Sequence, residues 1–90
     1  MKISIGVITK DFNSLEPIDE FLENASKHNH KIYSIIIVYS HGCDFRLVES
    51  LGKKVKVFLI KINDAPEIKE QLIKMGLSTE NIKFYSIAPP

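Results

Sequence analysis

The sequence predicts a small three-layer α/β domain with a mostly parallel sheet. Four segments are rich in apolar residues, and the first three are apolar at nearly every position. Strands of that kind are usually covered on both faces, as in parallel sheets flanked by helices. Polar turns and segments with a helical spacing of apolar residues separate them, which gives the order βαβαβαβ. The expected strands are residues 2–9, 32–39, 55–62 and 81–87.

The first strand is expected to lead into a helix that lies on the sheet. Asn13 or Ser14 is suited to cap this helix, which should run to about residue 27. Pro17 falls in its first turn, where a missing amide hydrogen costs little. The start of the chain superficially resembles a secretory signal, but it lacks a small-residue cleavage site. A buried strand is therefore the better interpretation.

The second strand is the most β-branched part of the chain and should lie near the sheet centre. A shorter helix is expected at 45–53, and a third helix should begin near Pro66 and end at Gly76. Asp64 and Glu67 have the spacing of a reciprocal cap for that third helix. Its apolar stripe consists of Ile68, Leu72, Ile73 and Met75. Right-handed crossovers should place neighbouring helices on predictable faces of the sheet. The expected sheet has the first strand between the second and the fourth.

Composition and charge restrict the classes of function. Ninety residues with 44% hydrophobic content correspond to a single domain, residues 1–90. The net charge of +1 comes from interspersed charges, so neither nucleic acid nor an anionic membrane is an expected partner. No run approaches the roughly 18 apolar residues of a membrane span. The single cysteine cannot form an internal disulfide, which indicates a cytoplasmic location.

A binding site is expected where the strands end. The carboxyl ends of parallel strands meet at one edge of a sheet, and ligands bind there. The polar residues expected at this edge are Lys10, Asp11, Asn13, Ser40, His41, Cys43, Asp44, Asn63 and Asp64. Among the residues at the strand ends, the predicted ligand-binding residues are Thr9, Asp11, Asn13, Ser40, Asp44 and Asn63. Neither the glycine-rich dinucleotide fingerprint nor a Walker sequence is present, so a tightly held pyrophosphate is not expected. The sequence leaves the cofactor unknown.

Cys43 is a candidate nucleophile, because it precedes a predicted helix start whose amides would stabilise a thiolate. The alternative is a partly buried loop residue, with Asp44 as the helix cap. No second cysteine is available for redox chemistry. His41 with Cys43, or His28 with His30, supplies at most half of a zinc site, so no metal site is predicted.

The amino-terminal part of the chain also resembles that of family 2 glycosyltransferases, which have the GT-A fold. Residues 3–9 followed by Phe12-Asn13 are similar to that family's first strand and its aromatic-Asn pair. Residues 35–38 are similar to its second strand. Where the family continues with Val-Asp-Asp-Gly-Ser-x-Asp, residues 38–44 read Val-Tyr-Ser-His-Gly-Cys-Asp and keep only the final aspartate, Asp44.

The resemblance implies a Rossmann-like, nucleotide-binding half that holds a nucleotide or nucleotide-sugar. The ninety residues contain no Asp-x-Asp metal-binding segment, acceptor half or catalytic base of that family. We therefore expect a truncated or degenerate domain that is not catalytic alone. One alternative is a non-catalytic interaction module that forms a homodimer through the strand at 81–87, where Lys83 alone opposes edge pairing. A second alternative is a small thiol-dependent enzyme built on Cys43.

Overall fold

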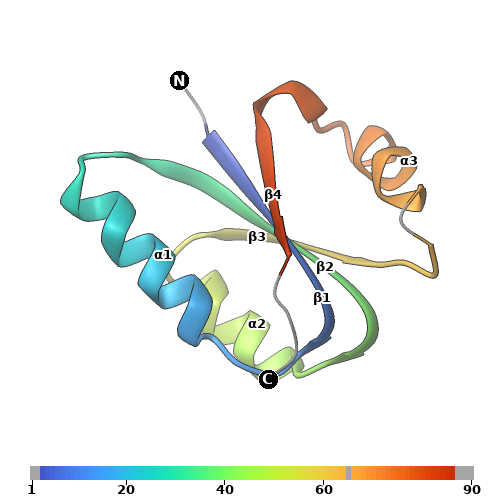
Figure 1. The fold of residues 1–90 in the computed structure, drawn as a ribbon, viewed down its shortest axis with the longest axis horizontal. Helices are drawn as coiled ribbons and strands as arrows, with labels where there is room; N and C mark the ends of the chain where they lie inside the picture. Colours follow the sequence, from blue (N-terminus) through green and yellow to red (C-terminus); the bar gives the residue numbers. More distant parts are fainter. Residues whose placement is uncertain (1–2, 65, 87–90) are drawn as a thin grey trace.

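The computed structural model describes residues 3–64 and 66–86. Strands and helices alternate along this part of the chain (Figure 1). The strands are β1 (Ile3–Phe12), β2 (Ile32–Cys43), β3 (Lys56–Lys61) and β4 (Ile82–Ser86). The helices are α1 (Glu16–Lys27), α2 (Phe45–Gly52), α3 (Glu67–Lys74) and the 3-10 turn η1 (Thr79–Asn81). Lys2 and Ile87, which end two of the predicted strands, lie outside the described residues.

The four strands of the described chain form one parallel sheet in the order β3-β2-β1-β4. This confirms the predicted α/β class and the position of β1 between β2 and β4. Helices α1 and α2 lie on one face of the sheet and α3 lies on the other (Figure 1). The direction of the crossovers explains the layers. From β1 to β3 the chain advances one way across the sheet and then returns to β4, so right-handed crossovers place α3 on the opposite face.

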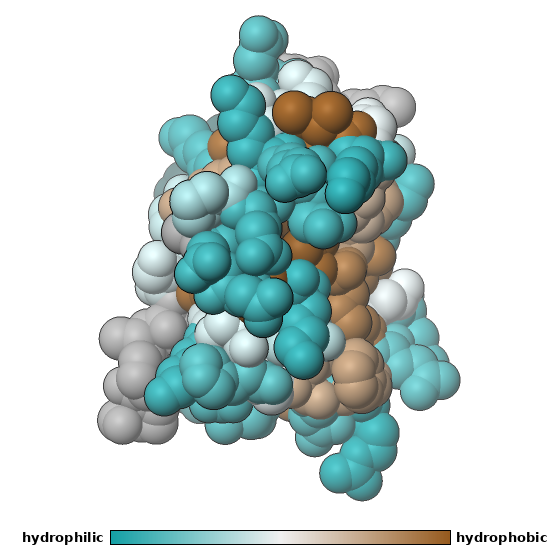
Figure 2. Space-filling model, turned by 90° about the vertical axis from the view of Figure 1, so that its right-hand side faces the viewer, coloured by the Kyte–Doolittle hydropathy of each residue, from teal (hydrophilic) through white to brown (hydrophobic). Residues whose placement is uncertain are grey.

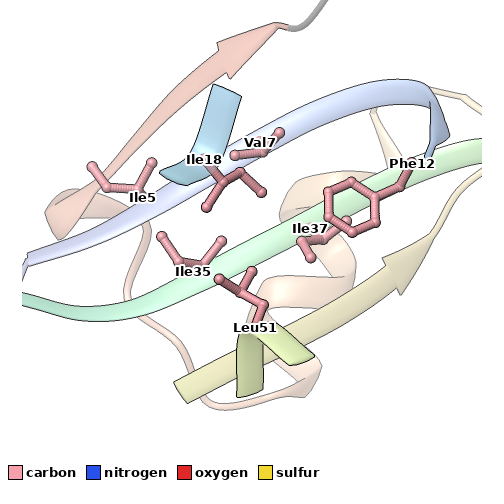
Figure 3. Close-up of a cluster of buried hydrophobic side chains, with 7 residues drawn as sticks. All are labelled: Ile5, Val7, Phe12, Ile18, Ile35, Ile37 and Leu51. Carbon is pink, nitrogen blue, oxygen red and sulfur yellow. The ribbon is translucent and has the colours of Figure 1, made fainter. Parts of the chain in front are cut away.

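The sheet separates two apolar clusters. The larger one lies against α1 and α2, and its side chains point toward one another in Figure 3; it consists of Ile5, Val7, Phe12, Ile18, Ile35, Ile37 and Leu51. The other lies on the side of α3 and consists of Ile36, Val38, Ile60, Ile62 and Leu72. Successive residues of β2 contribute alternately to the two clusters, because side chains alternate between the faces of a sheet. This is why β2 is apolar at every central position.

Strands β1 and β2 extend further than the sequence predicts. They end at Phe12 and Cys43 rather than at Thr9 and Tyr39, and they stay paired beyond a register shift. Phe12 is buried, with 2% of its surface exposed, and its carbonyl accepts the amide of Asp44 at 2.8 Å. Because this aromatic ring is buried, the polar residues before it are held in a two-stranded extension of the sheet.

The starts of α1 and α2 use their polar residues differently. At α1 the N-cap is Leu15, without a side-chain bond, and the Ser14 hydroxyl accepts the amide of Glu16 at 3.2 Å. Of the two predicted capping residues, Ser14 thus satisfies one helix amide from just outside the cap. At α2 the Asp44 carboxylate accepts the amide of Arg46 at 3.0 Å, which is the capping role considered for it.

Helix α3 is flanked by two residues that disfavour helix, Pro66 before it and Gly76 after it. Its N-cap is Pro66, without a side-chain bond, and the predicted reciprocal cap between Asp64 and Glu67 is replaced by a bond from the Asn63 amide to the Glu67 carboxylate at 3.3 Å. Gly76 has a φ of +74°, which confirms the predicted left-handed stop. Both ends are therefore set by backbone geometry more than by side-chain caps.

Helix α3 buries less of its predicted stripe than expected. Leu72 is buried and Ile68 packs against the same cluster, but Ile73 is 62% exposed. Residues four apart share a helix face, so Ile68 and Leu72 contact the sheet together and Ile73 is turned away. The inward position predicted for Ile73 is wrong. Seen from the side on which α3 lies, the molecule exposes apolar surface between hydrophilic side chains (Figure 2).

Candidate functional site

The carboxyl ends of the strands form a common rim. Thr9 pairs with Tyr39, which in turn pairs with Lys61, and the amide of Ile62 donates to the Tyr39 carbonyl at 3.0 Å. The last described pair between β1 and β4 joins Ile8 to Ser86. The predicted meeting of strand ends at one edge of the sheet is thus confirmed.

A hollow of about 380 Å³ lies at this rim, and each of the four strand ends contributes to it. Its lining residues are Ile8, Thr9, Lys10, Ser40, His41, Ile62, Asn63 and Ser86. They supply three hydroxyls, one amide, one imidazole and one ammonium group, and the two isoleucines add apolar surface. Within the described residues, no carboxylate lines the hollow. Its chemistry is therefore that of a hydrogen-bonding surface with a positive charge.

Three of the predicted binding residues meet in this hollow: Thr9, Ser40 and Asn63. The Thr9 hydroxyl donates to the Asp11 carbonyl at 3.1 Å, and the Ser40 hydroxyl lies 3.0 Å from Nδ1 of His41. These contacts restrict the rotation of both hydroxyls while leaving each oxygen able to accept a further bond. The rim thus presents partly oriented polar groups.

Asp11, Asn13 and Asp44, also predicted for the site, do not line the hollow. Asp11 pairs with Gly42 in the extension of β1 and β2, and a Cβ at Gly42 would come within 2.8 Å of its carboxylate oxygen. Asp44 caps α2. Asn13 directly follows the end of β1. The continued pairing of the two strands carries these residues past the rim, which is why their positions in the sequence were misleading.

Lys10, His41 and Ser86 also line the hollow; Lys10 and His41 were expected at this edge without being chosen as binding residues, and Ser86 was not expected there. Lys10 and His41 adjoin Thr9 and Ser40, so their proximity in the sequence was a usable signal. Ser86 could have been found from the fourth strand, since the last residues of neighbouring parallel strands lie at the same edge. The residue types alone did not identify it.

The surroundings of Cys43 do not favour a nucleophile. This free thiol is half-buried and packs against the apolar cluster beneath α1 and α2, and it does not line the rim hollow. Burial raises the pKa of the Cys43 thiol, and the neighbouring Asp44 carboxylate raises it further. Both effects oppose the thiolate on which the hypothesis of a thiol-dependent enzyme depends.

Clusters suited to a metal ion do not occur among residues 3–64 and 66–86, where no group of three or more His, Cys, Asp or Glu side chains lies close enough together. His28 and His30 stack with their ring centroids 6.5 Å apart.

None of the described helices combines the length and the apolar character needed to cross a membrane.

Comparison of the chain with protein-family models, with curated proteins and with solved structures finds no match. The resemblance to family 2 glycosyltransferases therefore rests on the sequence motifs.

Proposed function

We propose that this chain is a glycosyltransferase-like domain that binds a nucleotide or nucleotide-sugar at the rim hollow and does not catalyse sugar transfer alone. One observation carries the proposal. The hollow combines an ammonium group, an imidazole, three hydroxyls and an amide with no carboxylate among its described lining residues. This set of groups suits an anionic ligand rich in acceptor oxygens.

Phosphate oxygens would find suitable partners at the rim. Lys10 can supply a charge-assisted hydrogen bond, which is stronger than a bond between neutral groups. The Asn63 amide can donate to a further oxygen of the same group, and so can the Ser40 hydroxyl in the tautomer of His41 that carries its proton on Nδ1. Ile8 and Ile62 offer apolar surface for part of a base or ribose.

The dimensions favour weak binding. The volume of about 380 Å³ falls at the lower end of ligand pockets. A nucleoside diphosphate would therefore be only partly enclosed, and we expect a Kd on the order of 0.1–1 mM. Such an affinity is consistent with the lack of a glycine-rich loop to hold a pyrophosphate.

Two carboxylates predicted for the site lie outside the hollow, which supports binding without catalysis by the chain alone. Asp11 and Asp44 belong to the extension of β1 and β2 and to the α2 cap, respectively, rather than to the hollow. At the position of Tyr39 or Ser40, the family that this chain resembles has an acidic residue that helps to bind the nucleotide base. The proposal is thus limited to binding, in a cytoplasmic protein with a free thiol.

Titration of the ¹⁵N-labelled protein with uridine and guanosine diphosphates tests the proposal. We expect saturable shifts of the Thr9, His41 and Asn63 amides, with inorganic phosphate moving a subset of them. Lys10→Gln should weaken binding tenfold or more, since one charge-assisted bond is worth roughly 1.5–3 kcal/mol. The matched control, Lys27→Gln, removes an exposed lysine of α1 that pairs with Glu23 and should bind normally.

The absence of a response at the rim up to millimolar ligand would refute the proposal. An equal loss of affinity in both lysine variants would show that the charge acts only at long range.

A second candidate function is a non-catalytic interaction module that forms a homodimer through the edge of β4. The observation that favours it is the exposure of this strand. Residues 83–86 are exposed, and they include two large aromatic side chains, Phe84 and Tyr85, with 37% and 46% of their surfaces accessible. Exposed edge strands of this kind are templates for pairing with another chain.

A further inference from the structure

A groove between α1 and β4 differs in chemistry from the rim. On the face of the sheet that carries α1, the ring of Tyr85 meets that of Phe21 at a centroid distance of 5.7 Å and an interplanar angle of 50°. Two adjoining hollows share these two rings and Ile5 as lining residues. The groove consists of both hollows, with the ring pair between them.

The inner hollow of the groove is apolar. It has a volume of about 190 Å³ and is lined by Ile5 and Val7 of β1, by Ile18 and Phe21 of α1, and by other apolar or aromatic residues. An apolar cavity of about 150 Å³ stays dry and holds a ligand of the size of benzene. The inner hollow is therefore large enough for part of an aliphatic or aromatic ligand.

The outer hollow is polar and basic at one end. Its volume is about 380 Å³, and Asn24, His28, His30 and Lys83 contribute to its lining. Nδ1 of His28 donates to the Asn24 carbonyl at 2.9 Å, which fixes this imidazole at the end of α1. Of the described residues that line this hollow, none carries a carboxylate. A negative group in the outer hollow would thus meet an ammonium, two imidazoles and an amide.

The geometry points to an anionic amphiphile as the occupant of this groove, namely a soluble carboxylate with an unbranched aliphatic tail. The carboxylate would lie near Lys83 and the two histidines, and the tail would follow β1 from Ile3 toward Val7. Those two positions are about 13 Å apart along a strand. An extended chain advances about 1.2 Å per bond, so the groove matches a tail of about ten carbons.

This site is independent of the proposed function. Ile3 and Ile32, at the amino ends of β1 and β2, line the outer hollow, whereas the rim hollow lies at the carboxyl ends. The headgroup site therefore lies at the amino ends of the strands, and the rim lies at their carboxyl ends. Amide shifts of rim residues and of groove residues can accordingly be read separately in one protein sample.

The test is an NMR titration with carboxylates of four to twelve carbons below their micelle concentrations. We expect saturable shifts at Ile5, Phe21 and Lys83, with Thr9 and Asn63 unmoved. Affinity should rise about fourfold for each added CH₂ group and level off near ten carbons. Decanol should bind at least tenfold more weakly than decanoate, and decyltrimethylammonium should not bind.

Two lysine variants separate the headgroup contact from general charge. Lys83→Gln should reduce decanoate affinity about tenfold. Lys74→Gln should not, because that exposed lysine of α3 pairs with Glu70. Affinity independent of tail length, equal binding of the cationic amphiphile, or binding only to anionic vesicles would each overturn the inference. The tail-length series needs no variant, so the test remains decisive if Lys83→Gln fails to fold.

Discussion

A pair of hydroxyls is buried between the two central strands, on the side of the sheet that faces α3. The Ser4 and Ser34 oxygens lie 2.7 Å apart, and the two residues are 9% and 0% exposed. Each hydroxyl satisfies the other in a region where water could not replace the bond. Buried polar groups are tolerated only when they are paired in this way, so the two serines depend on one another.

We expect Ser34→Ala to lower the free energy of unfolding by about 1–3 kcal/mol, because the Ser4 hydroxyl is left buried without a partner. The double variant Ser4→Ala/Ser34→Ala should recover part of this loss, since it removes both polar groups. Ser26→Ala, at an exposed position of α1, is the control and should change stability by less than about 0.5 kcal/mol. Urea denaturation measures these variants together with Ser4→Ala; additive effects of the two single buried substitutions in the double variant would contradict the expected coupling.

Cys43 provides a second test, through the pH dependence of its alkylation. Burial, followed by the Asp44 carboxylate, raises the pKa of this thiol, so the thiolate should appear at a higher pH than in a model thiol. Asp44→Asn should lower the midpoint toward the model value, because it removes a negative neighbour. Glu49→Gln, which removes one charge from an exposed position of α2, should leave the midpoint unchanged. A wild-type midpoint below that of a model thiol would revive the nucleophile hypothesis.

Helix α2 depends on its first residues because it has only eight. Its amino end contains no acidic residue in the first turn, so the Asp44 carboxylate is the group that accepts an amide there and complements the helix dipole. Leu51, which is fully buried, attaches the other end of the helix to the core. The helix is thus held by one cap and a short apolar face.

We expect Asp44→Ala to cost about 1 kcal/mol of stability, whereas Asp44→Asn should cost only a few tenths, because asparagine caps as well as aspartate. Comparison of the two variants by thermal denaturation separates the cap from the charge. For a domain of this size, 1 kcal/mol corresponds to roughly 4–8 °C in Tm. Equal losses in both variants would assign the effect to the dipole and to the contact with Arg46 rather than to the cap.

The strands were predictable because each depends on a local pattern. β2 is apolar at successive positions, and this indicates burial on both faces whatever the rest of the chain does. The end of β2 was not predictable, because pairing beyond Tyr39 is stabilised by the burial of Phe12, a residue of another strand. Because of this tertiary contact, three of the six predicted binding residues, Asp11, Asn13 and Asp44, lie outside the hollow. Thr9, Ser40 and Asn63 line the hollow because they lie in or close to the last row in which β1, β2 and β3 all pair.

The two edges of the sheet differ in their protection. β3 begins and ends with a lysine, and the Lys56 ammonium lies 5.2 Å from the ring centroid of Phe58. β4 has Lys83 alone, and its Phe84 ring lies over Gly6, where an added Cβ would clash with it. Charged residues discourage edge pairing, so β4 is the edge more open to a second strand. The two sides of the molecule therefore differ in their tendency to pair with a second chain, and β4 is the side expected to do so.

Dimerisation through β4 is the expected result if the exposed edge is an interface. Two copies paired antiparallel about Phe84 would place Lys83 opposite Tyr85 of the second copy, which keeps the two lysines apart. An interface this small should have a Kd on the order of 100 μM. Sedimentation velocity over a range of concentrations measures it, and Tyr85→Lys should abolish the dimer by placing lysines opposite one another.

The matched control for this substitution is Ile73→Lys, which replaces an even more exposed apolar side chain, on α3, without touching the edge. It should dimerise as the wild type does, because it leaves the hydrogen-bonding groups of β4 unchanged. Dimerisation lost only in the α3 variant would place the interface on α3, where Ile73 is exposed. A strictly monomeric wild type at millimolar concentration would remove the second candidate function and leave ligand binding at the rim as the role to be tested.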